Sequence, residues 1–187
     1  MSIVVAKKLV QVIGGTPKIF NYCDDQGISN VDLYIGEETP QKGLITCSTV
    51  GLSEYNIGLK LPNGKRVAAE FIGTCSSLYK YFTNIVSSCA FNIISGNYFC
   101  CPGAVYPDMI AQYYEGIDMK HVMFSEPFLW DDLSNIEQED KVITWLMIVP
   151  ISDAELQYLK EYGSDALETL FEEKNIDIFD LERKSVV

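Results

Sequence analysis

Most catalytic arrangements that this 187-residue sequence could build would depend on its one histidine, His121. A Ser–His–Asp or Cys–His site needs an imidazole as general base, and His121 is the sole candidate. It begins the segment HVMFSEPF, which has the composition of a strand, and an imidazole there is more often a hydrogen-bonded structural group than a base. The sequence also lacks a Walker motif, a Rossmann glycine fingerprint, a nucleophile elbow and a His-Glu-x-x-His motif. We therefore expect no catalytic residue.

Six cysteines could form disulfides or a zinc site, but their spacing favours neither. Zinc sites usually contain Cys-x-x-Cys pairs or closely spaced cysteine and histidine, and the sequence has no such pair. Adjacent cysteines, as in Cys100-Cys101, cannot easily bond to each other. We expect buried, reduced, structural thiols, with no metal and no cofactor, at Cys23, Cys47, Cys75, Cys89, Cys100 and Cys101.

Carboxylates supply the remaining polar chemistry. Adjacent acidic residues are typical of solvated surface, and such pairs occur at Asp24-Asp25, Glu37-Glu38, Asp131-Asp132 and Glu172-Glu173. A denser acidic group lies before the last apolar segment, without the D-x-[DN]-x-[DN]-G order of a calcium loop. We interpret this group as a surface for protein recognition. Its members are the candidate partner-binding residues Glu126, Asp131, Asp132, Glu137, Glu139 and Asp140.

The formal net charge of −12 is concentrated in the last third of the chain. Residues 1–125 contain 10 acidic and 9 basic residues, whereas residues 126–187 contain 16 acidic and 5 basic residues. Such a surface repels nucleic acid phosphates and anionic membranes, and it attracts a basic protein. We therefore expect a protein partner and neither a nucleic acid nor a membrane.

The first two thirds of the sequence predict strands and two helices around a sheet. Helical spacing of apolar residues predicts a helix from Ile3 to Ile13 and a longer one from Leu78 to Ile94. Short β-branched and aromatic segments between turn residues predict neighbouring strands at 18–23, 30–36 and 43–51. Alternation from Tyr55 to Leu61, followed by Pro62-Asn63-Gly64, predicts a hairpin within 54–73.

The segment from Val142 to Val149 has the composition of a strand that is buried on both faces. It is nearly all apolar and has no alternation, so we place it inside the sheet and expect it to end at Pro150. Ser152 and Glu155 have the spacing of a capping box at the start of a helix, with Ile151 and Leu156 as a hydrophobic staple.

A second helix should follow directly. Gly163 has the position of a left-handed C-cap for the first helix, and Ser164 that of the N-cap of the next. Leu167, Leu170 and Phe171 would share one face of that helix.

The length and composition are those of a single α+β domain spanning residues 1–187, with a largely antiparallel mixed β-sheet flanked by helices. The first 15 residues have lysines within their apolar run, unlike a signal peptide, and no apolar stretch is long enough to span a membrane. We expect a soluble, cytoplasmic protein.

The order of motifs in the last third resembles the suppressor-of-fused (SUFU) domain. A histidine-led strand runs into a Pro-Phe-x-Trp loop, an apolar strand with a tryptophan follows, and then come Val-Pro-Ile-Ser-x-x-Glu, Tyr-Leu, Gly and a closing Arg-x-Ser. The residues that carry the resemblance are His121, Pro127, Phe128, Trp130, Trp145, Val149, Pro150, Ile151, Glu155, Tyr158, Leu159, Gly163, Arg183 and Ser185.

The resemblance implies a SUFU-like fold and a binding protein that is not an enzyme. Bacterial members of this family look like immunity proteins, or antitoxins, that neutralise polymorphic toxins, many of them nucleases encoded next to the immunity gene. We therefore expect a cognate toxin, basic and encoded nearby, as partner. The alternatives are another intracellular protein-binding or sequestering module, and an enzyme or small-ligand-binding domain.

Overall fold

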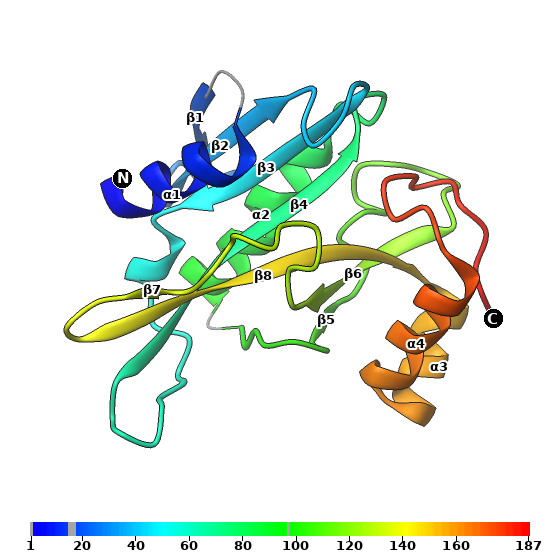
Figure 1. Cartoon of the computed structure of the whole chain (residues 1–187). Helices are drawn as coiled ribbons and strands as arrows, with labels where there is room; N and C mark the ends of the chain where they lie inside the picture. Colours follow the sequence, from blue (N-terminus) through cyan, green and yellow to red (C-terminus); the bar gives the residue numbers. More distant parts are fainter. Residues whose placement is uncertain (1, 15–17, 97) are drawn as a thin grey trace.

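A mixed sheet of eight strands forms the centre of the computed structural model, which describes residues 2–14, 18–96 and 98–187. The strand order is β1-β2-β3-β4-β8-β6-β5, and the short β7 pairs with β8 (Figure 1). Only β4 and β8 pair in parallel; the other pairs of named strands are antiparallel. The strands are β1 (Lys18–Cys23), β2 (Asn30–Glu37), β3 (Leu44–Val50), β4 (Arg66–Ser76), β5 (Val105–Tyr106), β6 (Met119–Ser125), β7 (Ile136–Glu137) and β8 (Lys141–Ser152). This architecture confirms the expected α+β class and largely antiparallel sheet.

Helices cover both faces of the sheet. Helix α1 (Ile3–Ile13), which is confirmed with its expected bounds, and helix α2 (Phe82–Gly96) lie on opposite faces (Figure 1). Each helix contributes an apolar stripe to a separate core. Val5 and Leu9 of α1 pack with Trp145 of β8, whereas Phe82 and Ile85 of α2 pack with Phe71 of β4.

Strand β8 is interior to the sheet and buried on both faces, as the unbroken apolar run predicts. Its odd-numbered residues from Ile143 to Ile151 belong to the core on the α1 face, while Leu146 and Ile148 belong to the core on the α2 face. Alternating side chains of one strand point to opposite faces, so a strand with helices on both sides needs apolar residues at every position.

The prediction that Pro150 ends this strand is wrong, since β8 continues to Ser152 and Pro150 pairs with Val122 of β6. Pairing with β4 stops at Met147, so the other edge of β8 is open at Pro150. There the Pro150 carbonyl accepts a hydrogen bond of 2.9 Å from Arg183 Nη2. A proline is tolerated in a strand where its missing N–H would face away from the neighbouring strand.

Two short helices, α3 (Asp153–Tyr162) and α4 (Ser164–Lys174), follow β8 directly. The capping box is confirmed: the Glu155 amide donates to Ser152 Oγ over 3.1 Å, and the Ser152 amide donates to Glu155 Oε2 over 3.0 Å. Gly163 caps α3 with φ 91°, a conformation that favours glycine, although its ψ of 166° is outside the left-handed helical region. Gly163 is also the N-cap of α4, so the prediction of Ser164 as N-cap is wrong.

The predicted hairpin within 54–73 is reduced to one bridge between Lys60 and Arg66 around the expected turn. Just before the first arm of this hairpin, the chain forms a 3-10 turn at Leu52–Glu54, and the buried carboxyl group of Glu70 binds its backbone. Glu70 accepts hydrogen bonds from the amides of Gly51, Leu52 and Ser53. Glu70 belongs to β4, the second arm of the predicted hairpin, and local alternation does not show that its side chain binds the chain before the first arm.

Helix α2 begins four residues later than the spacing from Leu78 predicts. The Ser77 amide donates to the carbonyl of Gly43, which holds this part of the chain in a turn after β4. Leu78 is 82% exposed as a result, and the apolar stripe of the helix starts at Phe82.

Candidate functional site

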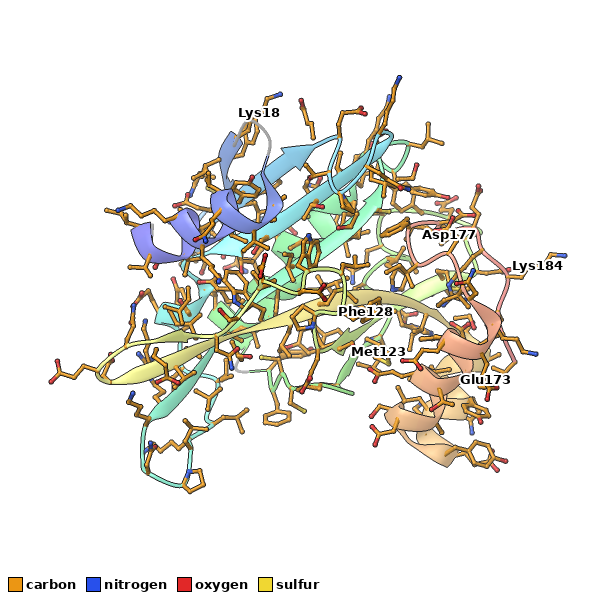
Figure 2. All side chains as sticks on the ribbon, in the orientation of Figure 1. Lys18, Met123, Phe128, Glu173, Asp177 and Lys184 are labelled. Carbon is orange, nitrogen blue, oxygen red and sulfur yellow. The ribbon has the colours of Figure 1, made fainter. Side chains whose placement is uncertain are left out.

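A groove of about 410 Å³ lies where helix α4 and the chain after it pack against strands β6 and β8. Asn175, with φ 48° and ψ 55°, turns the chain at the end of α4 so that residues 176–179 form one wall. Figure 2 labels Met123 and Phe128 on the sheet side, Glu173 on α4 and Asp177 on the segment that follows. The groove is lined by Met123, Ser125, Glu126, Phe128, Leu129, Val149, Glu168, Phe171, Glu172, Asn175, Ile176, Ile178 and Phe179.

The floor of the groove is apolar and belongs to the sheet. Met123 of β6 and Val149 of β8 are directly opposite each other in the antiparallel register, and both are buried. Phe171 of α4 packs in the same core. Phe128, at the rim, is 58% exposed, although it belongs to the short loop in which Trp130 is buried. A large exposed aromatic residue beside an apolar groove is typical of a contact surface.

Three carboxylates also line the groove. Glu126 directly follows β6, and Glu168 and Glu172 are one turn apart on α4, so they lie on one side of that helix. Ser125 Oγ donates to Glu168 Oε1 over 2.7 Å, which orients that carboxylate. Within the described residues, no ion pair involves any of the three. The arrangement suits the binding of a cation next to an apolar group.

A buried ion pair holds the chain that forms the wall. Arg183 Nη1 and Nη2 donate to Glu155 Oε1 and Oε2 over 2.6 and 2.8 Å, and the Val186 amide donates to Glu155 Oε1. The Arg183 guanidinium also lies 5.2 Å from the centre of the Phe171 ring, within the range of a cation–π contact. At the last residue of the wall, the carbonyl of Phe179 accepts a hydrogen bond of 3.0 Å from the Ser76 amide at the end of β4.

The six acidic residues predicted from the sequence are all exposed, but the structure distributes them over several places. Glu126 alone lines the groove. Asp131 and Asp132 lie on the loop anchored by buried Trp130 and Leu133.

The other three acidic residues are at the turn between β7 and β8, where two of them meet basic partners. Glu137 pairs with Lys65 at 3.0 Å and Asp140 with Arg66 at 3.6 Å, while Glu139 is exposed. The segment is therefore not the single-sign patch that its sequence indicates, because the 62–66 turn brings positive charge to it.

Sequence reasoning missed Glu168 and Glu172 as members of the site. Glu172 had the appearance of solvated helix surface, and nothing local distinguishes it from Glu173, which does not line the groove. The spacing of four between Glu168 and Glu172 was the available signal, because it places both side chains on one face of a helix. Which face looks onto the groove depends on how α4 packs.

His121 is buried and hydrogen-bonded at both ring nitrogens. The amide of Asp108 donates to Nδ1 over 2.9 Å, so Nε2 carries the proton that is donated to Asp153 Oδ1 at 2.9 Å. The hydrogen bond from Lys120, together with that from His121, lowers the pKa of Asp153. These contacts tie β6 to the start of α3 and to the chain near Asp108, which is a structural role.

The cysteines are all free thiols. Cys47, Cys75, Cys89 and Cys100 are buried, Cys101 is partly buried and Cys23 is exposed. Burial raises the pKa of each of the four buried thiols, that of Cys100 to about 12. The prediction that all six are buried is therefore wrong for Cys23, which lies on the edge strand β1.

The described residues contain no group of three or more His, Cys, Asp or Glu side chains placed to hold a metal ion. None of the helices formed by these residues is long and apolar enough to cross a membrane.

The fold and sequence together define a family. The family model described as "Suppressor of fused protein (SUFU)" matches residues 27–184. The chain therefore belongs to the suppressor of fused family. A curated relative, "Immunity protein YqcF" from Bacillus subtilis (strain 168), is 42% identical over 185 residues, which cover 98% of this chain and 96% of the relative.

Solved structures show the same fold at low sequence identity. A putative SUFU homologue from Neisseria gonorrhoeae has a TM-score of 0.71 at 16% identity, covering 98% of this chain and 94% of the other. A chain of the Sufu-Fu complex has a TM-score of 0.68 at 11% identity, covering 98% and 91%. Drosophila Suppressor of Fused has a TM-score of 0.55 at 11% identity, and there the match covers 91% of this chain but 42% of the Drosophila chain.

Proposed function

We propose that this protein is a cytoplasmic immunity protein that binds a cognate protein toxin and neutralises it without catalysis. The observation that carries the proposal is the 42% identity to the Bacillus subtilis immunity protein over nearly the whole of both chains. The groove adds support, because it offers an apolar surface and hydrogen-bond acceptors suited to contact with another protein.

The toxin that fits this surface best is a basic one, and we propose a nuclease. A nuclease must bind phosphates and so tends to be positively charged around its active site. Residues 126–187 carry 16 acidic and 5 basic residues, and an acidic protein can occupy such a site and block substrate access. Opposite charges also steer the two proteins together, with association rates of up to about 10⁸ to 10⁹ M⁻¹s⁻¹ at low salt.

Within the acidic segment from Glu126 to Asp140, the exposed residues Asp131 and Asp132 are the best placed to steer a partner. No ion pair within the described residues neutralises them, whereas Lys65 and Arg66 neutralise much of the charge of Glu137 and Asp140. We therefore propose this segment as the region of first contact with the toxin, and we expect Asp131 and Asp132 to contribute most to the steering.

The experiment that tests the function is co-expression with the toxin encoded beside this protein's gene. The immunity protein should restore growth of cells that express the toxin, and a tagged copy should retain the toxin through purification. Toxin that kills equally in the presence of well-expressed immunity protein, and that fails to co-purify with it, would contradict the proposal.

Charge reversal tests the role of the acidic segment. Changing Asp131, Asp132, Glu137 and Glu139 to Lys should slow association with the toxin and flatten its dependence on salt, because steering acts on the association rate. The pair D131K/D132K should reproduce most of this effect, and E137K/D140K should have less. Binding rates equal to wild type in the fourfold variant would show that the segment does not contact or steer the toxin.

A further inference from the structure

We propose that the groove between β6, β8 and α4 binds an aromatic side chain of the toxin that lies next to a lysine or arginine. This inference deepens the proposed function and rests on it. The acidic segment would accelerate the encounter, whereas the groove would hold the complex together once it has formed.

The size and the lining of the groove favour an aromatic side chain. A volume of about 410 Å³ is at the small end of the range of ligand pockets, which suits an inserted side chain rather than a whole element of structure. Phe128, Phe171 and Phe179 offer ring faces and edges to an incoming ring. Met123, which is fully buried in the floor, adds a polarisable thioether beneath the exposed lining.

The three carboxylates require a positive charge close to that ring. Glu126, Glu168 and Glu172 line the groove from two elements, the end of β6 and helix α4. A toxin residue next to the inserted ring could reach either side with an ammonium or guanidinium group. Hydrogen bonds in which both partners are charged are among the strongest polar contacts between proteins.

Hydrogen bonds and an ion pair order the groove in the absence of a partner. Its wall is tied to the sheet at two points, the Phe179 carbonyl to the end of β4 and Arg183 to Glu155. Arg183 also packs over Phe171, and Ser125 orients Glu168. A site that is already ordered loses less conformational entropy on binding, so more of the contact energy appears as affinity.

Two other occupants fit the same groove poorly. A second copy of this chain would bring another protein of net charge −12 against an acidic surface. An anionic lipid surface would be repelled for the same reason. A basic protein segment is the occupant that both the charge and the apolar floor favour.

Methyl NMR with short peptides tests the chemistry of the groove directly. The probes are the methyl groups of Met123, Ile176 and Ile178, which line it. Adding the capped tripeptide Arg-Phe-Arg at millimolar concentration should shift these signals, and salt should weaken the effect. Glu-Phe-Glu should leave them unchanged, and Arg-Gly-Arg should shift them less because it has no ring to insert.

A matched pair of variants separates the groove from the general acidity of the chain. E126K/E172K should abolish the shifts caused by Arg-Phe-Arg, whereas E126K/E173K, which has the same net charge, keeps Glu172 and should retain a measurable part of them. Glu173 is on the same helix as Glu172 but does not line the groove. The inference is wrong if Arg-Phe-Arg leaves the groove methyl groups unmoved, or if it shifts them equally in E126K/E172K.

The toxin itself provides the second part of the test. Phe128→Ala combined with E126K/E172K should raise the dissociation rate of the complex roughly tenfold or more, as expected for the loss of a central anchor. If the wild type binds the toxin and this variant dissociates at the same rate, the groove is not the anchor and the immunity function stands. If the wild type does not bind the toxin, both the proposed function and the assignment of a toxin to the groove fail.

Discussion

Arg183 and Glu155 form a two-point ion pair in the interior of the protein, with the arginine 7% exposed and the glutamate 0% exposed. The same carboxylate belongs to the capping box of α3 and accepts the Val186 amide. One glutamate thus connects the start of a helix to the end of the chain, and the arginine compensates its buried charge.

Replacing Arg183 with Ala should therefore lower the free energy of unfolding by about 3 to 5 kcal/mol, because it leaves a buried carboxylate without its counter-ion. Urea unfolding measures the loss. Lys184→Ala, at an exposed neighbouring position, is the control and should stay within about 0.5 kcal/mol of wild type. A loss below about 1 kcal/mol for Arg183→Ala would show that the pair is not closed in solution.

Trp145→Ala should cost about 3 to 5 kcal/mol of stability, since it removes a large, buried side chain from the core on the α1 face. An unchanged melting temperature would mean that β8 is wrongly placed.

Trp145→Phe should lower the stability less than Trp145→Ala, and its effect should be concentrated in the loop of residues 131–135. The indole Nε1 donates to the carbonyl of Ser134 over 3.2 Å, and phenylalanine lacks that donor. Hydrogen exchange should therefore accelerate around residues 131–135 in this variant. Exchange that accelerates equally throughout the sheet would contradict a local role of this hydrogen bond.

Glu70 should make stability fall as the pH rises from 4.5 through the raised pKa of its carboxyl group. Burial raises the pKa of its carboxyl group above 4.5, although hydrogen bonds from Thr49, Ser53 and Gly51 oppose that shift. The folded state therefore binds this proton more tightly than the unfolded state. The stability that the group contributes is complete below 4.5 and is lost as the pH rises through the folded pKa.

Urea unfolding of the wild type and Glu70→Gln over this range checks the sign. The difference in unfolding free energy, wild type minus variant, should decrease with rising pH, because glutamine does not titrate. A difference that increases with pH would show that the hydrogen-bond donors outweigh burial and lower the pKa.

The thiols should react in the order of their exposure. In the native protein at about pH 8, a thiol reagent should modify Cys23 rapidly and Cys101 more slowly. The four buried cysteines should react only after unfolding, because burial both shields them and raises their pKa. Cys23→Ser should remove the rapid phase and leave the others; rapid reaction of a second thiol in that variant would contradict the burial.

The local signals in the sequence were sufficient wherever neighbours in the chain decide the structure. The stripe of α1, the buried run of β8 and the Ser152–Glu155 capping box depend on contacts within one element, and all three are as expected. The first arm of the hairpin within 54–73 forms no strand beyond the Lys60–Arg66 bridge, and Glu70 of the second arm binds the backbone of residues 51–53 instead. The prediction that β8 ends at Pro150 was wrong because only the sheet shows that the edge of β8 facing β4 is unpaired at this residue.

For the candidate site, the sequence by itself determined the excess of negative charge in the last third and the position of Glu126 within it. Tertiary structure alone decided where that charge stays uncompensated. It brings Lys65 and Arg66 to Glu137 and Asp140, and it sets Glu168 and Glu172 across an apolar floor from Glu126. The physical reason is that charges interact through space over a few ångströms, and residues far apart in the chain meet at that distance only after the sheet has formed.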